Sequence, residues 1–70
     1  MTNHVYSVSE IVGSSPNTIE EAINNALARA RKTLRHLDWF EVTELRGRLS
    51  AEGTVDSYQV TLKLGFRMED

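Results

Sequence analysis

The sequence predicts an α+β fold with the element order β-α-β-β, in which a three-stranded antiparallel sheet packs one face on a single helix. Three patterns predict this fold. A β-branched run ends in a cluster of turn-forming residues, a long segment repeats apolar residues at three- and four-residue steps, and two segments then alternate apolar and polar residues. No linker, repeat or low-complexity segment interrupts the 70 residues, so we expect one domain over residues 1–70.

The first strand is expected over residues 5–12, an apolar and β-branched stretch. Gly-Ser-Ser-Pro-Asn follows at residues 13–17 and predicts a tight connection into the helix. Two helix caps compete there: Ser15 with a proline at the first helical position, or Thr18 with Glu21 as a capping box. Either cap would contribute about 1 kcal/mol.

The helix is expected to run for five turns with one buried face. Its apolar stripe consists of Ile19, Ala22, Ile23, Ala26, Leu27, Ala30, Leu34 and Leu37. The charges suit the helix macrodipole, because acidic residues occupy the first turns and basic residues crowd the last ones. The acidic residues are Glu20 and Glu21, and the basic ones are Arg31, Lys32, Arg35 and His36.

Two further strands are expected after Trp39, joined by a turn at residues 50–54 into an antiparallel hairpin. In the last strand the apolar face consists of Tyr58, Val60, Leu62, Leu64 and Phe66. The sheet face that no helix covers would then present Glu44, Arg46, Gln59, Thr61, Lys63 and Arg67. This surface is too polar for a core and suits a wet interface between subunits or a ligand cleft.

Size and composition narrow the possible classes of protein. A 70-residue chain gains little net stability from its own core, and the absence of cysteine excludes disulfides and thiolate metal sites. His4 and His36 lack the spacing of a zinc ligand set, so self-association is the expected source of extra stability.

The charge balance and the apolar runs exclude two kinds of partner. The net charge of −2 argues against nucleic-acid binding, which normally shows a basic excess. No apolar run approaches the roughly 20 residues that span a bilayer, and the N-terminus lacks a basic region followed by an apolar one. A soluble, cytoplasmic protein is expected.

Trp39 is the one tryptophan of the chain, at the expected junction between helix and strand. A lone tryptophan in a small domain is commonly a core anchor. Here Leu37, Phe40 or Val42 could fill the core instead, which would leave the indole free to stack on a ligand. The residues alone leave both interpretations open.

Three polar residues on the expected free face are candidates for ligand recognition. The Gln59 amide offers a donor and an acceptor, the pattern that an imide or pyrimidine edge requires, although it could also be a solvated strand residue. Arg46 and Arg67 could hold a phosphate. Pairing with Glu44 or Glu69 across strands is the alternative role for each arginine.

Signatures of catalysis are weak in this sequence. Ser14 and Ser15 lie outside any G-x-S-x-G motif, and neither histidine has neighbours that indicate a triad. Residues 13–15 could receive a phosphate on helix N-terminal amides, but they lack the G-x-G-x-x-G and Walker spacings. A plain connection and a non-enzymatic protein are expected.

Several segments closely resemble the dodecins, small flavin-binding proteins of bacteria and archaea. They are residues 6–13, Ser-Pro at 15–16, Ala-Leu-Ala-Arg-Ala at 26–30, Leu-Asp-Trp-Phe-Glu-Val at 37–42, Arg-Gly at 46–47 and Tyr-Gln-Val-Thr-Leu-Lys-Leu-Gly-Phe-Arg at 58–67. The resemblance covers nearly the whole chain. It implies a β-α-β-β protomer whose sheet wraps around its helix, assembled into a hollow homododecamer built from trimers.

The resemblance also implies a flavin site at interfaces between subunits, where stacked flavin pairs lie between symmetry-related tryptophans. The family's tryptophan falls on Trp39, and the glutamine that hydrogen-bonds the isoalloxazine edge falls on Gln59. The family's arginines near the ligand and the channels fall on Arg46 and Arg67. Tyr6 aligns with an aromatic residue near the phosphate arm.

The expected function is storage of flavin and quenching of its photochemistry. FMN is the expected flavin, riboflavin is the alternative, and coenzyme A is a further candidate ligand of the arginine-lined channels. Ser7 and Ser9 stand where many dodecins have basic or aliphatic residues, which reduces the positive charge available to a phosphate. One rival is a flavin-dependent enzyme, disfavoured because no obvious acid, base or nucleophile lies near Trp39 or Gln59. The other is a structural cage without a ligand.

Overall fold

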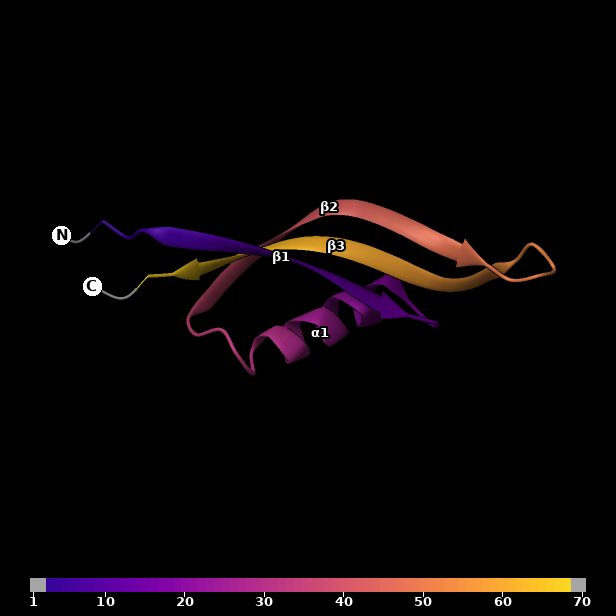
Figure 1. Ribbon diagram of the computed structural model, residues 1–70, viewed down its shortest axis with the longest axis horizontal. Coiled ribbons are helices and arrows are strands. Elements are labelled where there is room, and N and C mark those ends of the chain that lie inside the picture. The colour runs from indigo at the N-terminus through magenta and orange to yellow at the C-terminus, as the bar shows by residue number, and fades with distance from the viewer. Residues whose placement is uncertain (1–2, 69–70) are drawn as a thin grey trace.

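The computed structural model describes residues 3–68 and confirms the predicted element order (Figure 1). The elements are β1 (Tyr6–Ser15), α1 (Ile19–Ala30), β2 (Leu37–Leu49) and β3 (Val55–Arg67). The strands form one antiparallel sheet in the order β1-β3-β2, so the last strand of the chain is central. The hairpin of β2 and β3 turns at residues 50–54, as predicted.

The core lies between α1 and the middle of the sheet. Alternate residues of β3 face the helix, and Val60, Leu62 and Leu64 are fully buried there. The helix meets them with small side chains, Ala22, Ala26 and Ala30. Small residues on a helix face allow its backbone to approach the sheet closely, and this brings α1 down onto β1 and β3.

Strand β1 is longer than predicted and includes the residues taken for a turn. Ser14 and Ser15 continue the pairing, opposite Gln59 and Tyr58 of β3. Gly13 also lies inside the strand, opposite Val60. The helix approaches it so closely that a Cβ there would overlap the Ala22 carbonyl oxygen and lie 2.8 Å from the Ala26 Cβ. Pairing with the central strand therefore overrides the turn preference of these residues.

Thr18 is the helix cap, as one of the two predictions had it, and the alternative cap Ser15 is wrong. The reciprocal half of the predicted capping box is also wrong, because the Thr18 N–H bonds to Ser15 Oγ at 3.4 Å and not to the Glu21 carboxylate. The Thr18 hydroxyl accepts a hydrogen bond from the backbone N–H of Glu21 at 2.9 Å. Buried Ser15 instead donates its hydroxyl to Glu21 Oε1, and Asn17 Nδ2 donates to the same oxygen at 2.9 Å. These two hydrogen bonds lower the pKa of Glu21 below its ordinary value.

The helix is shorter than predicted and ends at Ala30, before the last two residues of the apolar stripe. The chain then turns, with the Leu34 N–H bonded to the Ala30 carbonyl at 2.9 Å, and His36 adopts a positive φ of 61° that a helix excludes. Leu37 pairs with Phe66 and begins β2. Leu34 and Leu37 still pack against the core, which explains why both matched the stripe.

Because the helix ends at Ala30, most of the basic residues and Trp39 lie in other elements than predicted. Only Arg29 lies in the last turn of α1, whereas Arg31, Lys32, Arg35 and His36 occupy the connection to β2. Trp39 is therefore a strand residue inside β2 and does not terminate a helix.

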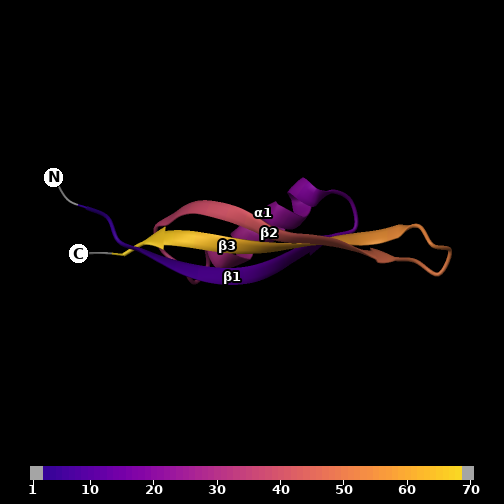
Figure 2. The ribbon, with the colours of Figure 1, turned by 90° about the horizontal axis from the view of Figure 1, so that it is seen from above.

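The protomer is long and thin, measuring 56 × 20 × 14 Å, because the hairpin projects far beyond the helix (Figures 1 and 2). Its radius of gyration is 14.7 Å, against about 11 Å for a compact domain of this length. Its accessible surface is 5320 Å², against about 4,400 Å² expected for a compact monomer of this mass. The excess surface is consistent with a subunit of a larger assembly.

Within residues 3–68, α1 packs on β1 and β3 but not on β2. Phe40, Val42 and Leu45 stand directly opposite buried residues of β3, on the helix side of the sheet. Each is nonetheless about half exposed, so the core role expected of Phe40 and Val42 is not fulfilled inside the protomer. The sheet thus leaves apolar surface open on the helix side as well as on the side that points away from α1.

Candidate ligand-binding face

The face of the sheet that points away from α1, called the free face below, holds the residues that the sequence singled out. Because Val60, Leu62 and Leu64 point to the helix, the intervening residues of β3 point outward. The register places Arg46 opposite Gln59 and Tyr6 opposite Arg67 on this face. These groups gather at two ends of the free face, which differ in chemistry.

Trp39 dominates the first end, the indole end. It pairs with Gly65 of the central strand, and the indole lies directly on that glycine, because a Cβ there would overlap the ring atoms Cε2, Cζ2 and Nε1. The side chain remains 41% exposed. The ring of Tyr6 flanks it, with the two centroids 6.4 Å apart and the planes tilted by 55°. Trp39 is therefore a supported aromatic surface that solvent reaches.

A hydrogen bond from β1 to β2 braces this end. The Tyr6 hydroxyl donates to Asp38 Oδ2 at 2.9 Å, across the central strand. This hydrogen bond, together with desolvation and the charge of Asp38, raises the pKa of Tyr6 above its ordinary value, and the positive charge of Arg67 opposes the shift. The raised pKa favours the protonated phenol, which is the form that donates this hydrogen bond.

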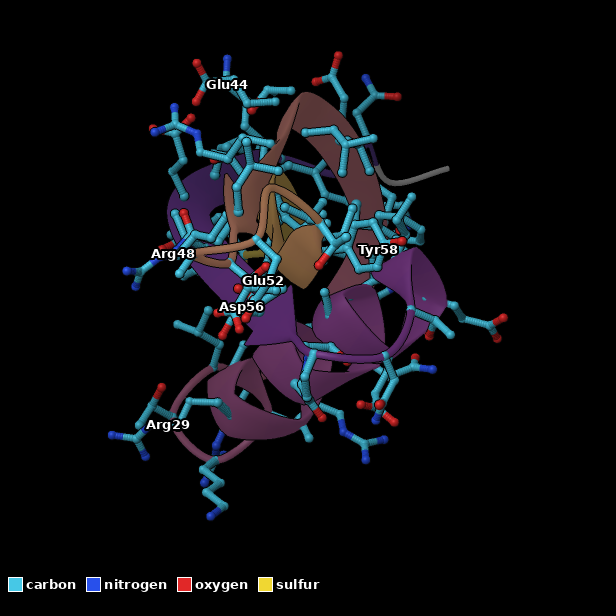
Figure 3. The ribbon with its side chains drawn as sticks, turned by 90° about the vertical axis from the view of Figure 1, so that its right-hand side faces the viewer. Arg29, Glu44, Arg48, Glu52, Asp56 and Tyr58 are labelled. Carbon is cyan, nitrogen blue, oxygen red and sulfur yellow. The ribbon has the colours of Figure 1, made fainter. Side chains whose placement is uncertain are left out.

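Gln59 and Arg46 define the second end, the amide end. Arg46 Nη2 contacts Glu44 Oε1 at 2.8 Å, and both side chains are about 60% exposed. Thr61 donates weakly to the same oxygen at 3.5 Å. A shallow groove of about 340 Å³ runs past these residues, and Figure 3 shows Glu44 on the side of the sheet opposite α1. Arg46 does pair with Glu44, but both residues lie in β2, so the predicted pairing across strands is wrong for Arg46.

The two ends are far apart within one protomer. Gly65, which supports the indole, lies six residues along β3 from Gln59, or roughly 20 Å of extended strand. The pair Lys63 and Glu41 lies between them. A planar ring that contacts the tryptophan therefore does not reach the glutamine of the same chain.

Sequence reasoning missed two residues of the indole end, Gly65 and Asp38. The sequence analysis assigned Gly65 no role of its own, yet a glycine in an otherwise alternating strand is a signal of close approach. Asp38 had no visible role because its partner Tyr6 lies in the first strand. Glu69, the other residue considered for pairing with an arginine, lies outside the described residues.

Among residues 3–68 there is no group of three histidine, cysteine or carboxylate side chains that could hold a metal ion. In the same part of the chain no helix has the length and apolar character needed to cross a membrane.

The protein is thus a small α+β protein that presents an indole and two arginines on the free face of a three-stranded sheet. A family model described as Dodecin matches residues 5–69. The dodecin of Thermus thermophilus is 59% identical over 66 residues, which cover 94% of each chain. The chain belongs to the dodecin family. Family membership implies an oligomeric assembly, and dodecins are generally small, non-enzymatic proteins.

Solved structures agree with this assignment. The dodecin from Streptomyces coelicolor superposes with a TM-score of 0.91 at 54% identity, covering 100% of this chain and 99% of that one. A Thermus thermophilus dodecin variant with tryptophan replaced by phenylalanine gives a TM-score of 0.89 at 56% identity, covering 97% of this chain and 100% of that one. Two further variants of that protein replace an arginine by alanine.

Proposed function

We propose that this dodecin stores flavins as stacked pairs at interfaces between its subunits and quenches their photochemistry. The observation that carries the proposal is the position of Trp39, whose indole lies directly against Gly65 and which is 41% exposed on the free face of the sheet. A tryptophan placed in this way contributes little to the core. Its aromatic face is available to a planar ligand.

The remaining roles follow from chemistry. The Gln59 amide would bond the imide edge of the isoalloxazine ring, with one donor and one acceptor. Arg46 and Arg67 would attract the phosphate of FMN, which makes FMN the proposed flavin and riboflavin the weaker alternative. Tyr6 lies beside Trp39 and opposite Arg67, so it would flank the aromatic platform near the phosphate arm.

The separation of the two ends supports a site shared between copies. Because roughly 20 Å of strand separates Gly65 from Gln59, one chain cannot supply both the stacking and the amide contact. A closed assembly that apposes free faces would supply them, and we propose the homododecamer built from trimers. Each stacking contact would add roughly 0.5 to 1.5 kcal/mol beyond burial of area.

Close contact between flavin and indole also explains how storage would protect the cell. An excited flavin accepts an electron from the adjacent indole and the electron then returns, so the excitation is lost without net chemistry. A flavin-dependent enzyme is the second candidate. The Tyr6 phenol and the Asp38 carboxylate beside Trp39 are hydrogen-bonded to each other, so neither is available as an acid or base for a substrate.

Fluorescence titration tests the proposal directly. Protein added to FMN or riboflavin in neutral buffer should quench the flavin emission strongly and saturate at one flavin per chain, because each flavin of a pair faces one tryptophan. Light scattering of the same sample should report about twelve subunits. Unquenched emission at saturating protein, or a monomer at micromolar concentration, would overturn the proposal. Turnover of a reduced nicotinamide by the loaded protein would favour the enzyme.

Competition identifies a second ligand. Coenzyme A added to the loaded protein should leave the quenched emission unchanged if it occupies separate arginine-lined channels, and should restore the emission if it competes for the flavin site.

A further inference from the structure

We propose that Tyr6 restores Trp39 after the indole has been oxidised: the phenol gives one electron to the indole and its hydroxyl proton to Asp38. This transfer, called the tyrosine relay below, rests on the proposed quenching of flavin and adds a step to it. Bound flavin, once excited, supplies the oxidant by taking one electron from the indole. An indole cation that does not regain an electron at once is open to irreversible oxidation.

Strand pairing brings the phenol ring to the indole. β1 and β2 lie on either side of β3 (Figure 2). Tyr6 on β1 and Trp39 on β2 have ring centroids 6.4 Å apart and planes tilted by 55°. Interacting aromatic pairs have centroids about 4.5 to 7 Å apart. Rings this close give an electron a short direct route, so Tyr6 is placed to donate to an oxidised Trp39.

Asp38 supplies the proton acceptor that oxidation of a phenol requires. A phenol that loses an electron becomes a far stronger acid, so the electron leaves readily where a base takes the proton. The Tyr6 hydroxyl donates to Asp38 Oδ2 at 2.9 Å, a distance suited to direct transfer of that proton. The phenol is thus bonded to a base before any light is absorbed.

An irregularity in β2 places both Asp38 and Trp39 beside Tyr6. The register against β3 shifts between Leu37 and Trp39, so Asp38 has no opposite residue in the central strand. An extra residue of this kind is typical of a β-bulge, which re-aims side chains. Adjacent side chains of a regular strand point to opposite faces, whereas here both neighbours meet the same tyrosine. One pair of consecutive residues therefore carries the electron acceptor and the proton acceptor.

Electrons and protons balance over the cycle. Tyr6 gives one electron to the indole cation and one proton to the Asp38 carboxylate, which leaves a neutral indole, a neutral phenoxyl radical and a carboxylic acid. The electron that first left the indole later returns to the phenoxyl radical, and Asp38 returns the proton with it. The groups regain their starting states, and no external oxidant or reductant is used.

Pulse radiolysis of the purified protein without flavin tests the relay directly, with the azide radical as a one-electron oxidant that prefers indole to phenol at neutral pH. Because Trp39 is the one tryptophan of the chain, the visible absorption of the indole radical reports this residue alone. In wild type this absorption should decay while the near-ultraviolet band of the phenoxyl radical grows, at a rate independent of protein concentration. Tyr6→Phe, which keeps the ring and loses the hydroxyl, should abolish the growth.

The second tyrosine of the chain provides the matched control. Tyr58 lies opposite Gly47, seven residues along β3 from Gly65, or roughly 23 Å of extended strand. Tyr58→Phe should leave the growth of the phenoxyl band as in wild type. Loss of the band in Tyr58→Phe and its survival in Tyr6→Phe would overturn the proposal.

Asp38→Asn separates proton transfer from a merely structural role. The amide oxygen still accepts a hydrogen bond from the Tyr6 hydroxyl, but the amide does not take up the proton at neutral pH. The phenoxyl band should grow roughly a hundredfold more slowly, which is the lower part of the range that a positioned base contributes. An unchanged rate would show that Asp38 takes no proton and would contradict the relay.

Blue light on protein loaded with FMN links the relay to the proposed function. Tyr6→Phe should quench FMN as wild type does, because the first electron still comes from Trp39, but its tryptophan emission should be lost faster in aerated buffer. Equal loss in both proteins would contradict protection of the indole. Since the radiolysis uses no flavin, absence of the phenoxyl band in wild type overturns the relay even where FMN is quenched. If the band grows but wild type does not quench FMN, the proposed function is wrong and the electron transfer from Tyr6 to Trp39 stands.

Discussion

The two ends of the free face present a contrast between a rigid site and an adaptable one. At the indole end, the Trp39 ring packs so closely on Gly65 that a Cβ there would overlap it. The Tyr6 hydroxyl of β1 donates a hydrogen bond to Asp38 of β2. At the amide end, Gln59 stands beside Arg46, which is held only by an exposed ion pair with Glu44. Packing fixes the first end, and solvent-exposed charges determine the second.

This contrast assigns different tasks to the two ends. Stacking requires a flat surface at a fixed height, and a ring supported by backbone provides one at low entropic cost. Recognition of an edge or a phosphate depends on polar groups that can turn toward the ligand. An exposed ion pair of the kind formed by Arg46 and Glu44 contributes only about 0 to 1 kcal/mol, so a phosphate can replace the carboxylate.

Removal of the indole should have the largest effect. Trp39→Ala is expected to weaken flavin binding by at least about 2 kcal/mol, or roughly 30-fold, because it deletes the aromatic platform. The thermal unfolding midpoint should hardly move, since the ring lies outside the core. A core tryptophan would instead cost about 3 to 5 kcal/mol in stability. Trp39→Phe is the control that keeps an aromatic ring. A collapse of the assembly with flavin binding intact would contradict this reading.

Gln59→Leu tests the amide end with the next largest effect. The variant keeps the shape of the side chain and removes its donor and acceptor, so the buried imide edge of the flavin loses its partner. The affinity should fall by about 1 to 3 kcal/mol, while the subunit number stays the same. Ser57→Val is a matched control on the same strand and face, two residues from Gln59 and opposite Arg48. If wild type and Gln59→Leu bound flavin with equal affinity, Gln59 would not contact the flavin.

Gly65→Ala tests whether rigidity at the indole end matters, with the tryptophan still present. The added Cβ overlaps the indole, which must tilt away, so the affinity should fall by about 1 to 2 kcal/mol. Tryptophan emission should shift as the ring moves. Gly47→Ala is the control, because a Cβ there meets only the Ser57 carbonyl oxygen, at 3.3 Å. If Gly65→Ala bound flavin as tightly as wild type, the packing of Trp39 on Gly65 would not determine the affinity.

The sequence predicted the element order because each element has a local pattern. The alternation in β3, the turn at residues 50–54 and the Thr18 cap depend on neighbouring residues, and all three are confirmed. The length of the helix was wrong because an apolar stripe reports which side chains face the core and not the backbone conformation. Leu34 and Leu37 face the core from outside the helix.

Whether Trp39 is a core residue or an exposed one could not be predicted from its neighbours in the sequence. Its position depends on pairing with Gly65, which is distant in the chain, and on Tyr6 from the first strand. The same holds for residues 13–15, whose local turn preference was overridden by pairing with β3. Non-local pairing determined the features that local patterns left open, and the indole end is built almost entirely from such pairings.

Glu44→Gln should have the smallest effect and would sharpen the account of the amide end. The carboxylate now holds Arg46 Nη2 at 2.8 Å, so removing its charge frees the guanidinium for a phosphate. FMN should bind more tightly by about 0.2 to 1 kcal/mol, because the lost pair is exposed and screened by solvent. Riboflavin, which has no phosphate, should bind as before, and added salt should diminish the gain for FMN. Glu41→Gln is the control, because it removes an exposed carboxylate of the same strand that lies opposite Lys63. An equal gain for both flavins, or for both variants, would mean that net charge and not release of Arg46 governs the affinity.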